Sequence, residues 1–122
     1  MEIPSEIDLL SVFECEPELL DKQKDSPFYY NKATYRFNNG RENFRVELSP
    51  SFEEFILEVQ DLHSKEVITY LQFIRVESLE ILEDRKEKSR ILLTLREEEI
   101  MQTIQVEFKP RFQLIIKQHL DI

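Results

Sequence analysis

The sequence predicts a mainly β protein, built as an antiparallel sandwich or a barrel-like meander of about seven or eight strands. Apolar residues recur at every second position through much of the chain, most clearly over residues 91–116. That period is typical of a sheet with one buried and one exposed face. Such strands must bury their dry face against a second sheet or by closing a barrel. The 122 residues suit one domain spanning 1–122, with at most one or two short helices.

The first apolar run, residues 7–15, fits two structures. Alternate positions are apolar, which indicates a strand: Ile7, Leu9, Phe13 and Cys15. Ser5 followed by Asp8 is a pattern that opens a helix, so a short helix is the alternative. Residues 16–25 are acidic and polar, and we expect them to form a connection with at most one helical turn.

A hairpin is predicted around Asn38-Asn39-Gly40. The aromatic-rich segment 28–37 forms its first strand, with one face carrying Tyr29, Ala33, Tyr35 and Phe37. Residues 44–48 alternate in the same way on the return strand. Asn-Gly tolerates the positive φ angles of a type I′ turn, which is typical of tight hairpins.

Residues 51–62 fit both regular periods. Phe55, Leu57 and Val59 alternate as in a strand, whereas Ser51 with Glu54 could form the capping box of a helix. We predict a strand, because it continues the rhythm of the hairpin, and keep a helix over 51–62 as the alternative.

The next segment, residues 67–82, opens with β-branched residues and changes parity at Val76. The opening favours a strand, and the change of parity predicts a bulge or bend that divides it. Residues 83–88 are read as a charged turn.

The last three strands can be paired by counting outward from their loops. A loop at 109–111 sets Phe108 against Phe112, Val106 against Leu114, and Ile104 against Ile116. A loop at 96–99 sets Leu95 against Ile100, Leu93 against Gln102, and Ile91 against Ile104. Apolar residues then meet apolar residues everywhere except at Gln102. The outward face carries Met101 and Ile115, which makes it less polar than an ordinary solvent face.

Charge and cysteine content narrow the class of protein. The net charge is −9, from 25 acidic and 16 basic residues, which argues against partners such as nucleic acid or an anionic membrane surface. A basic protein partner is compatible with this charge. Cys15 is the only cysteine, so no intrachain disulfide is expected, and it should pack as a small apolar residue. The acidic start of the chain does not resemble a signal peptide, so the expected location is cytoplasmic.

No motif for catalysis, a metal or a cofactor is found in the sequence. His63, His119 and Cys15 do not stand at ligand spacing, and a single glycine, Gly40, is too few for a phosphate-binding loop or a dinucleotide fingerprint. We therefore expect no catalytic residue, no metal and no cofactor. Two acids facing each other across a cleft would be the mark of an enzyme instead.

The predicted function is that of a small acidic interaction protein that binds a basic protein partner as an inhibitor, an immunity-type protein or a scaffold. Exposed tyrosine beside acid can form a protein-recognition surface, and the alternative is the ordinary decoration of a β-surface. The predicted partner-binding residues are Tyr29, Tyr30, Glu97, Glu98 and Glu99. The alternatives are a sandwich or barrel that holds a small apolar ligand in a pocket lined by Phe and Tyr, and a structural subunit of a larger assembly. A homo-oligomer is also compatible with the sequence.

Overall fold

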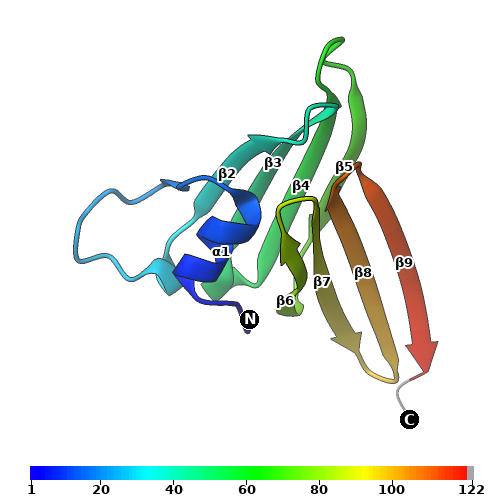
Figure 1. Cartoon of the computed structure of the whole chain (residues 1–122). Coiled ribbons are helices and arrows are strands. Elements are labelled where there is room, and N and C mark those ends of the chain that lie inside the picture. The colour runs from blue at the N-terminus through cyan, green and yellow to red at the C-terminus, as the bar shows by residue number, and fades with distance from the viewer. Residues whose placement is uncertain (121–122) are drawn as a thin grey trace.

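The protein is a β-sandwich of two antiparallel sheets. A computed structural model describes residues 1–120 and orders the strands β1-β2-β3-β4-β5 in one sheet and β6-β7-β8-β9 in the other (Figure 1). The first sheet consists of β1 (Glu18–Leu19), β2 (Ala33–Asn38), β3 (Glu42–Ser49), β4 (Glu54–Asp61) and β5 (Val67–Phe73). The second consists of β6 (Val76–Arg85), β7 (Lys88–Glu97), β8 (Ile100–Lys109) and β9 (Gln113–Leu120).

The predicted fold class is therefore confirmed in its sandwich form. The barrel alternative is wrong, because within residues 1–120 the strands form two separate sheets that do not pair edge to edge. The described residues form nine strands where seven or eight were expected. One of them, the two-residue β1, lies in the stretch predicted to be a connection.

The N-terminal segment is a helix, α1 (Glu6–Phe13), so the strand interpretation of residues 7–15 is wrong and the alternative of a short helix opened by Ser5 is confirmed. Ser5 has extended backbone, and its Oγ accepts a hydrogen bond of 3.1 Å from the Asp8 amide. This cap satisfies one of the free amides of the first turn. Leu9, Val12 and Phe13 stand at helical spacing and are buried, which packs one face of the helix into the core.

Ser5→Ala should lower the free energy of unfolding by about 1 kcal/mol, because the first turn then has an unpaired amide. Ser5→Asp keeps an acceptor at the cap and should stay close to wild type. Urea unfolding of the three proteins measures this. An equal loss in both variants would show that the cap is not the cause.

The aromatic segment begins as a loop and not as a strand. Residues Phe28–Tyr30 form a 3₁₀ turn, η1, and β2 starts only at Ala33. The buried Asn31 side chain holds the chain there, since its Oδ1 accepts from the Asp21 amide at 3.0 Å and its Nδ2 donates to the Asp21 carbonyl at 2.8 Å. Tyr29 therefore does not share a strand face with Ala33, Tyr35 and Phe37, as the sequence had suggested.

The predicted hairpin is confirmed, but its turn is not type I′. β2 and β3 pair with Tyr35 opposite Val46 and Phe37 opposite Phe44. Only Gly40 in the turn has a positive φ, of 89°, so the two-residue turn with two positive φ angles was a wrong prediction. The Asn39 Oδ1 instead accepts from the main-chain amides of the two residues after Gly40, which supports a longer loop.

Residues 51–62 contain the predicted strand. A 3₁₀ turn, η2 (Pro50–Phe52), precedes β4, whose inner face is fully buried at Phe55, Leu57 and Val59.

The predicted division of the segment 67–82 into two strands is also confirmed. Residues 74–75 form a sharp connection in which Arg75 has φ 61° and the chain passes from β5 in one sheet to β6 in the other. The charged turn at 83–88 is shorter than expected, because β6 and β7 extend to leave only residues 86–87 between them.

The register of the last hairpin is confirmed, whereas that of the preceding one is displaced by two residues. Val106 lies opposite Leu114 and Ile104 opposite Ile116, as predicted. Between β7 and β8 the turn is only Glu98–Glu99, because Arg96 and Glu97 continue the ladder. The observed pairs are Leu95 with Gln102, Leu93 with Ile104 and Ile91 with Val106. A shift of two residues keeps every side chain on its predicted face.

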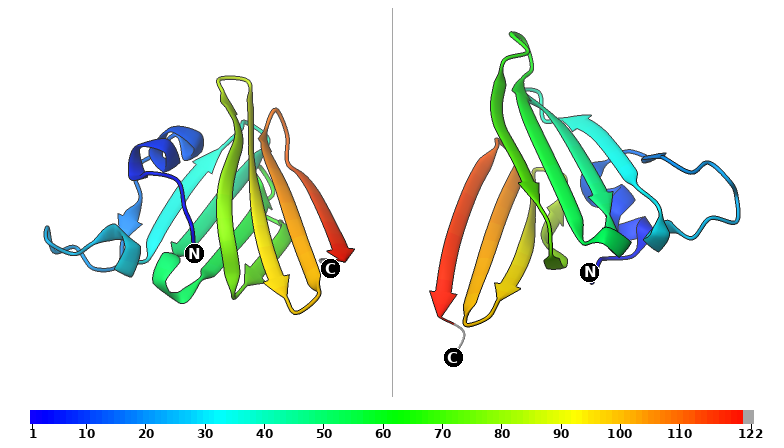
Figure 2. Two further views of the ribbon diagram at one scale, coloured as in Figure 1. Left: turned by 90° about the horizontal axis from the view of Figure 1, so that it is seen from below. Right: turned by 180° about the vertical axis from the view of Figure 1, so that it is seen from behind.

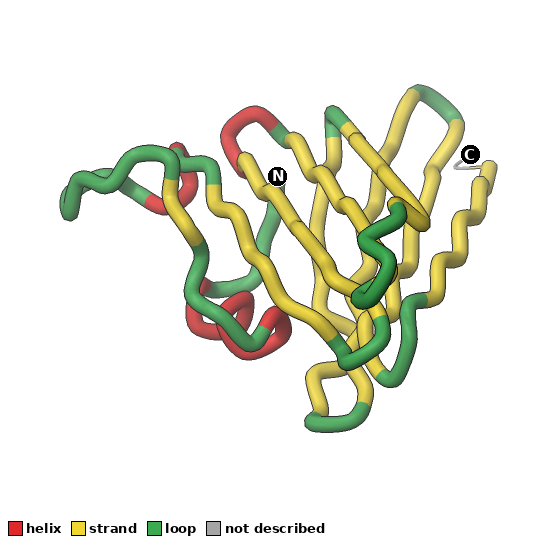
Figure 3. Tube along the Cα trace, turned by 90° about the horizontal axis from the view of Figure 1, so that it is seen from above, coloured by secondary structure: helices red, strands yellow, loops and turns green. Residues whose placement is uncertain are grey.

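The core lies between the sheets, and four aromatic rings pack against Phe108 or one another at its centre: Phe13, Tyr35, Phe37 and Phe44. Figure 3 shows the helical segments on one side of the strands and the last strand on the other. Figure 2 shows that the sheets diverge toward the C-terminal end of β9. Among residues 1–120, no helix has the length and hydrophobicity that crossing a bilayer requires.

Candidate partner-binding surface

Four short connections form one end of the sandwich, which we call the basal end (bottom of Figure 1). They are η1, η2, residues 74–75 and residues 98–99. Large apolar side chains are exposed at this end: Tyr30, Phe52, Ile74, Ile100 and Leu120, each with 47–79% of its surface accessible. Exposed apolar side chains gathered at one end are more typical of an interaction surface than scattered ones.

A groove of about 740 Å³, the basal groove, lies within this end. Its apolar walls come from the β5–β6 connection and from three strands of the second sheet: Ile74, Leu95, Ile100 and Leu120. Arg75, Arg96, residues 97–99, and the amides of Gln102 and Gln118 supply its polar lining. The groove thus joins aliphatic surface to charged and hydrogen-bonding groups.

The groove is open because the second sheet extends beyond the first. β7 and β8 have ten residues each, whereas β3 and β4, the longest strands of the first sheet, have eight. On the inner face of β9, Leu114 packs against the core, Ile116 is 46% exposed and Leu120 is 76% exposed. The same face that is covered by the first sheet at one end of β9 is therefore uncovered at the basal end.

Two carboxylates at the mouth of the groove have no counter-ion within residues 1–120. Glu97 pairs with Arg75 at 3.4 Å. Glu98 and Glu99 form no ion pair with any residue in the part of the chain that the structure describes. Both are exposed on a two-residue turn, in which Glu98 has φ 53°. Their negative charge is free to interact with a cationic partner.

The predicted tyrosines lie at the same end of the molecule but do not contact the glutamates. The Tyr29 and Tyr30 rings meet edge to face at 5.4 Å, and the Tyr29 hydroxyl accepts from the Met1 amino group at 3.1 Å. That amino group lies 3.8 Å from the Glu53 carboxylate, and the Glu53 carbonyl accepts from the Val76 amide, beside the groove. A chain of contacts thus links the tyrosines to the groove across the basal end.

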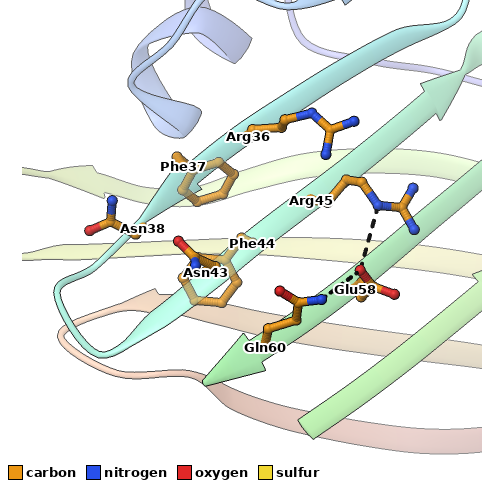
Figure 4. Close-up of a pocket in the computed structure, with 8 residues that line it drawn as sticks. All are labelled: Arg36, Phe37, Asn38, Asn43, Phe44, Arg45, Glu58 and Gln60. Carbon is orange, nitrogen blue, oxygen red and sulfur yellow. Dashed lines mark hydrogen bonds and ion pairs between the residues drawn. The ribbon is translucent and has the colours of Figure 1, made fainter. Parts of the chain in front are cut away.

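A second, shallower cavity of about 340 Å³ lies on the outer face of β2, β3 and β4 (Figure 4). Glu58, the carboxylate in its lining, is already paired, and so is the neighbouring Glu47. The Arg45 guanidinium contacts Glu47 at 2.5 Å and Glu58 at 3.8 Å, and Lys32 reaches Glu47 at 3.1 Å. The carboxylates on this face are therefore less available to a cationic partner than those at the basal end.

Partial burial raises the pKa of Glu47, but hydrogen bonds from Lys32 and Arg45 outweigh it, so that the pKa is lowered overall. A carboxyl group whose pKa is lower in the folded state stabilises the fold above its unfolded pKa, and this stability is lost as the pH falls through the folded pKa. Glu47→Gln should therefore unfold more easily than wild type at about pH 7, and the difference should shrink toward about pH 3. Urea midpoints across this range measure the effect, and a difference independent of pH would contradict it.

Potential reactive groups do not assemble into a second site. Cys15 packs against the core, as predicted for a small apolar residue, and burial raises the pKa of its thiol. His63 lies in the β4–β5 turn and His119 on β9. In residues 1–120, no three His, Cys, Asp or Glu side chains are grouped so that they could share a metal ion.

The sequence did not indicate the apolar part of the groove. Ile100 was placed in the core, and Ile74, Arg75 and Leu120 were assigned no role. Alternation correctly predicts that Ile100 faces inward. Alternation gives no signal that Ile100 is exposed, because exposure depends on how far the opposite sheet extends.

The fold and this surface define a β-sandwich with an uncovered apolar groove and an acidic turn at its mouth. No protein-family model matches the chain, and no curated protein sequence is significantly similar to it. Among solved structures, the chain is similar to one in a contact-dependent growth inhibition toxin - immunity protein complex from Klebsiella pneumoniae 342. The TM-score is 0.73 at 21% sequence identity, over 97% of this chain and 96% of that chain. The two chains therefore share a fold.

Proposed function

We propose that this chain is a non-catalytic, immunity-type protein that binds a basic protein partner and occludes it. The observation that carries the proposal is the basal groove. Exposed aliphatic side chains lie there beside the carboxylates of Glu98 and Glu99, which form no ion pair within residues 1–120. Burial of the aliphatic surface supplies affinity, and the carboxylates together with the net charge of −9 speed the encounter with a cationic surface.

The fold similarity supports a role in a protein complex. The similar solved complex contains a toxin and an immunity protein. We assign the immunity role to this chain because its acidity suits the neutralisation of a basic protein. Tyr29, Tyr30 and Glu97 join Glu98 and Glu99 in the proposed contact surface, since all five lie at the basal end.

The apolar-ligand alternative has less support. It required a pocket lined by Phe and Tyr, but Phe13, Phe37, Phe44 and Phe108 pack against one another in the core. The walls of the basal groove are aliphatic and open to solvent. An open groove suits the side chains of a protein segment better than a small molecule that must be enclosed.

Expression and capture in the source cells test the proposal. The chain expressed alone should leave growth unchanged, and its tagged form should retain a basic protein at about 0.05 M salt and lose most of it at about 0.5 M. Growth arrest on expression would instead indicate a toxin. Binding that does not respond to salt would remove the electrostatic basis of the proposal.

A further inference from the structure

We infer that β9 captures an extended segment of the basic partner as an additional strand of the second sheet. This inference rests on the proposed function for the nature of the partner, and it goes further by specifying how the partner is held. The contact would combine main-chain hydrogen bonds along β9 with side-chain contacts in the basal groove.

β9 is an unprotected edge. It is the outermost strand of its sheet, and all eight residues pair with β8. In an antiparallel ladder alternate residues bond to the neighbouring strand, so half of the main-chain N–H and C=O groups of β9 point away from the sheet. The strand contains no proline or glycine, and Lys117 is its only Lys, Arg, Asp or Glu.

The other sheet edges are less suited to strand addition. The edge of β6 is partly covered by the N-terminal segment, because Glu2 exchanges hydrogen bonds of 2.9 Å with Glu77 and Leu79. β1 has only two residues. β5 has a free edge, but Leu71 and Phe73 on its inner face already pack against the core. β9 is the long edge in the described chain whose two faces are both mostly exposed.

The side chains around β9 specify the chemistry of the added segment. A strand laid beside β9 directs every second side chain toward the face that carries Ile116 and Leu120, where apolar residues would be buried. Ile100 pairs with Leu120, so the added strand ends at the same end of the sheet as Glu98 and Glu99, with β9 and β8 between them. These carboxylates favour lysine or arginine at that end. A second copy of this chain is a poorer occupant, because each copy carries a charge of −9.

A peptide of four Lys-Val repeats is the probe, with hydrogen exchange of the β9 amides in the wild-type protein as the readout. Saturating peptide should slow this exchange by about tenfold. A peptide of four Glu-Val repeats should not slow it, nor should a Lys-Val peptide with N-methylated valines, which keeps the charge but loses donors. Ile116→Lys should abolish the protection, and Ile68→Lys, on the exposed part of β5, should retain it.

Equal protection by the N-methylated peptide, or none by either basic peptide, would overturn strand addition. Slow exchange of β9 that depends on protein concentration without peptide would overturn it in favour of a second copy. The proposed function is judged separately, by whether the full-length chain retains a basic protein in a salt-dependent way.

Discussion

Phe108→Ala should lower the free energy of unfolding by about 3–5 kcal/mol, the range measured for large-to-small changes at buried aromatic positions. Phe108 is 1% exposed, and its ring lies 5.1–5.8 Å from those of Phe13, Phe37 and Phe44. These rings come from α1 and both sheets, so the cavity left by alanine would loosen three parts of the fold at once. If one neighbouring ring moved into the cavity, it would lose its own contacts with the other rings.

Urea unfolding of Phe108→Ala measures this loss, with Phe52→Ala as the matched control. Phe52 loses the same atoms but is 79% exposed, so its stability should stay within about 0.5 kcal/mol of wild type. Phe52→Ala should instead weaken partner binding, because Phe52 lies at the basal end. Equal destabilisation by the two variants would contradict the position of the core.

The double variant Glu98→Lys/Glu99→Lys should weaken partner binding by about tenfold or more and reduce its dependence on salt. Both carboxylates are exposed and lack ion pairs within residues 1–120, so their replacement should cost little folding stability. The two lysines would place positive charge at the mouth of the groove, where a cationic partner is expected to approach.

The matched control is Glu66→Lys/Glu87→Lys, which changes the net charge by the same amount. Both residues are exposed, in the β4–β5 and β6–β7 turns, outside the basal end. Titration calorimetry with the copurified partner should give near wild-type affinity for this control. An equal loss of affinity in both double variants would mean that net charge, and not the acidic turn, determines binding.

Much of the fold could be predicted because its information is local. Alternation around Ile104 and Val106 determines which face is buried and, with a short loop, the register of β8 with β9. The change of parity at Val76 marks the point where the chain passes between sheets. The strand predictions failed where a side chain accepts a hydrogen bond from a main-chain amide, as Ser5 does at α1 and Asn31 does before β2. These hydrogen bonds favour a main-chain conformation other than a strand, and the pattern of apolar residues gives no information about them.

The candidate site was only half predictable. The acidic turn can be recognised in the sequence as Glu97-Glu98-Glu99, and three consecutive charged residues are expected to be exposed to solvent. The apolar wall is not visible, because Ile100 obeys the same alternation as the buried Ile104. The difference between them is whether the opposite sheet extends far enough to cover the position, and that depends on how the two sheets overlap in space. Sequence periodicity describes one strand at a time and does not contain this overlap.

The most direct test of the account is a titration of the copurified partner's activity with the purified chain. A non-catalytic inhibitor that occludes its partner should abolish the activity at a molar ratio of about one to one, and high salt or the Glu98→Lys/Glu99→Lys substitutions should weaken it. Inactivation of the partner at a small fraction of its molar amount would show turnover, and full activity in the presence of excess chain would show no inhibition. Either result would contradict the proposed function.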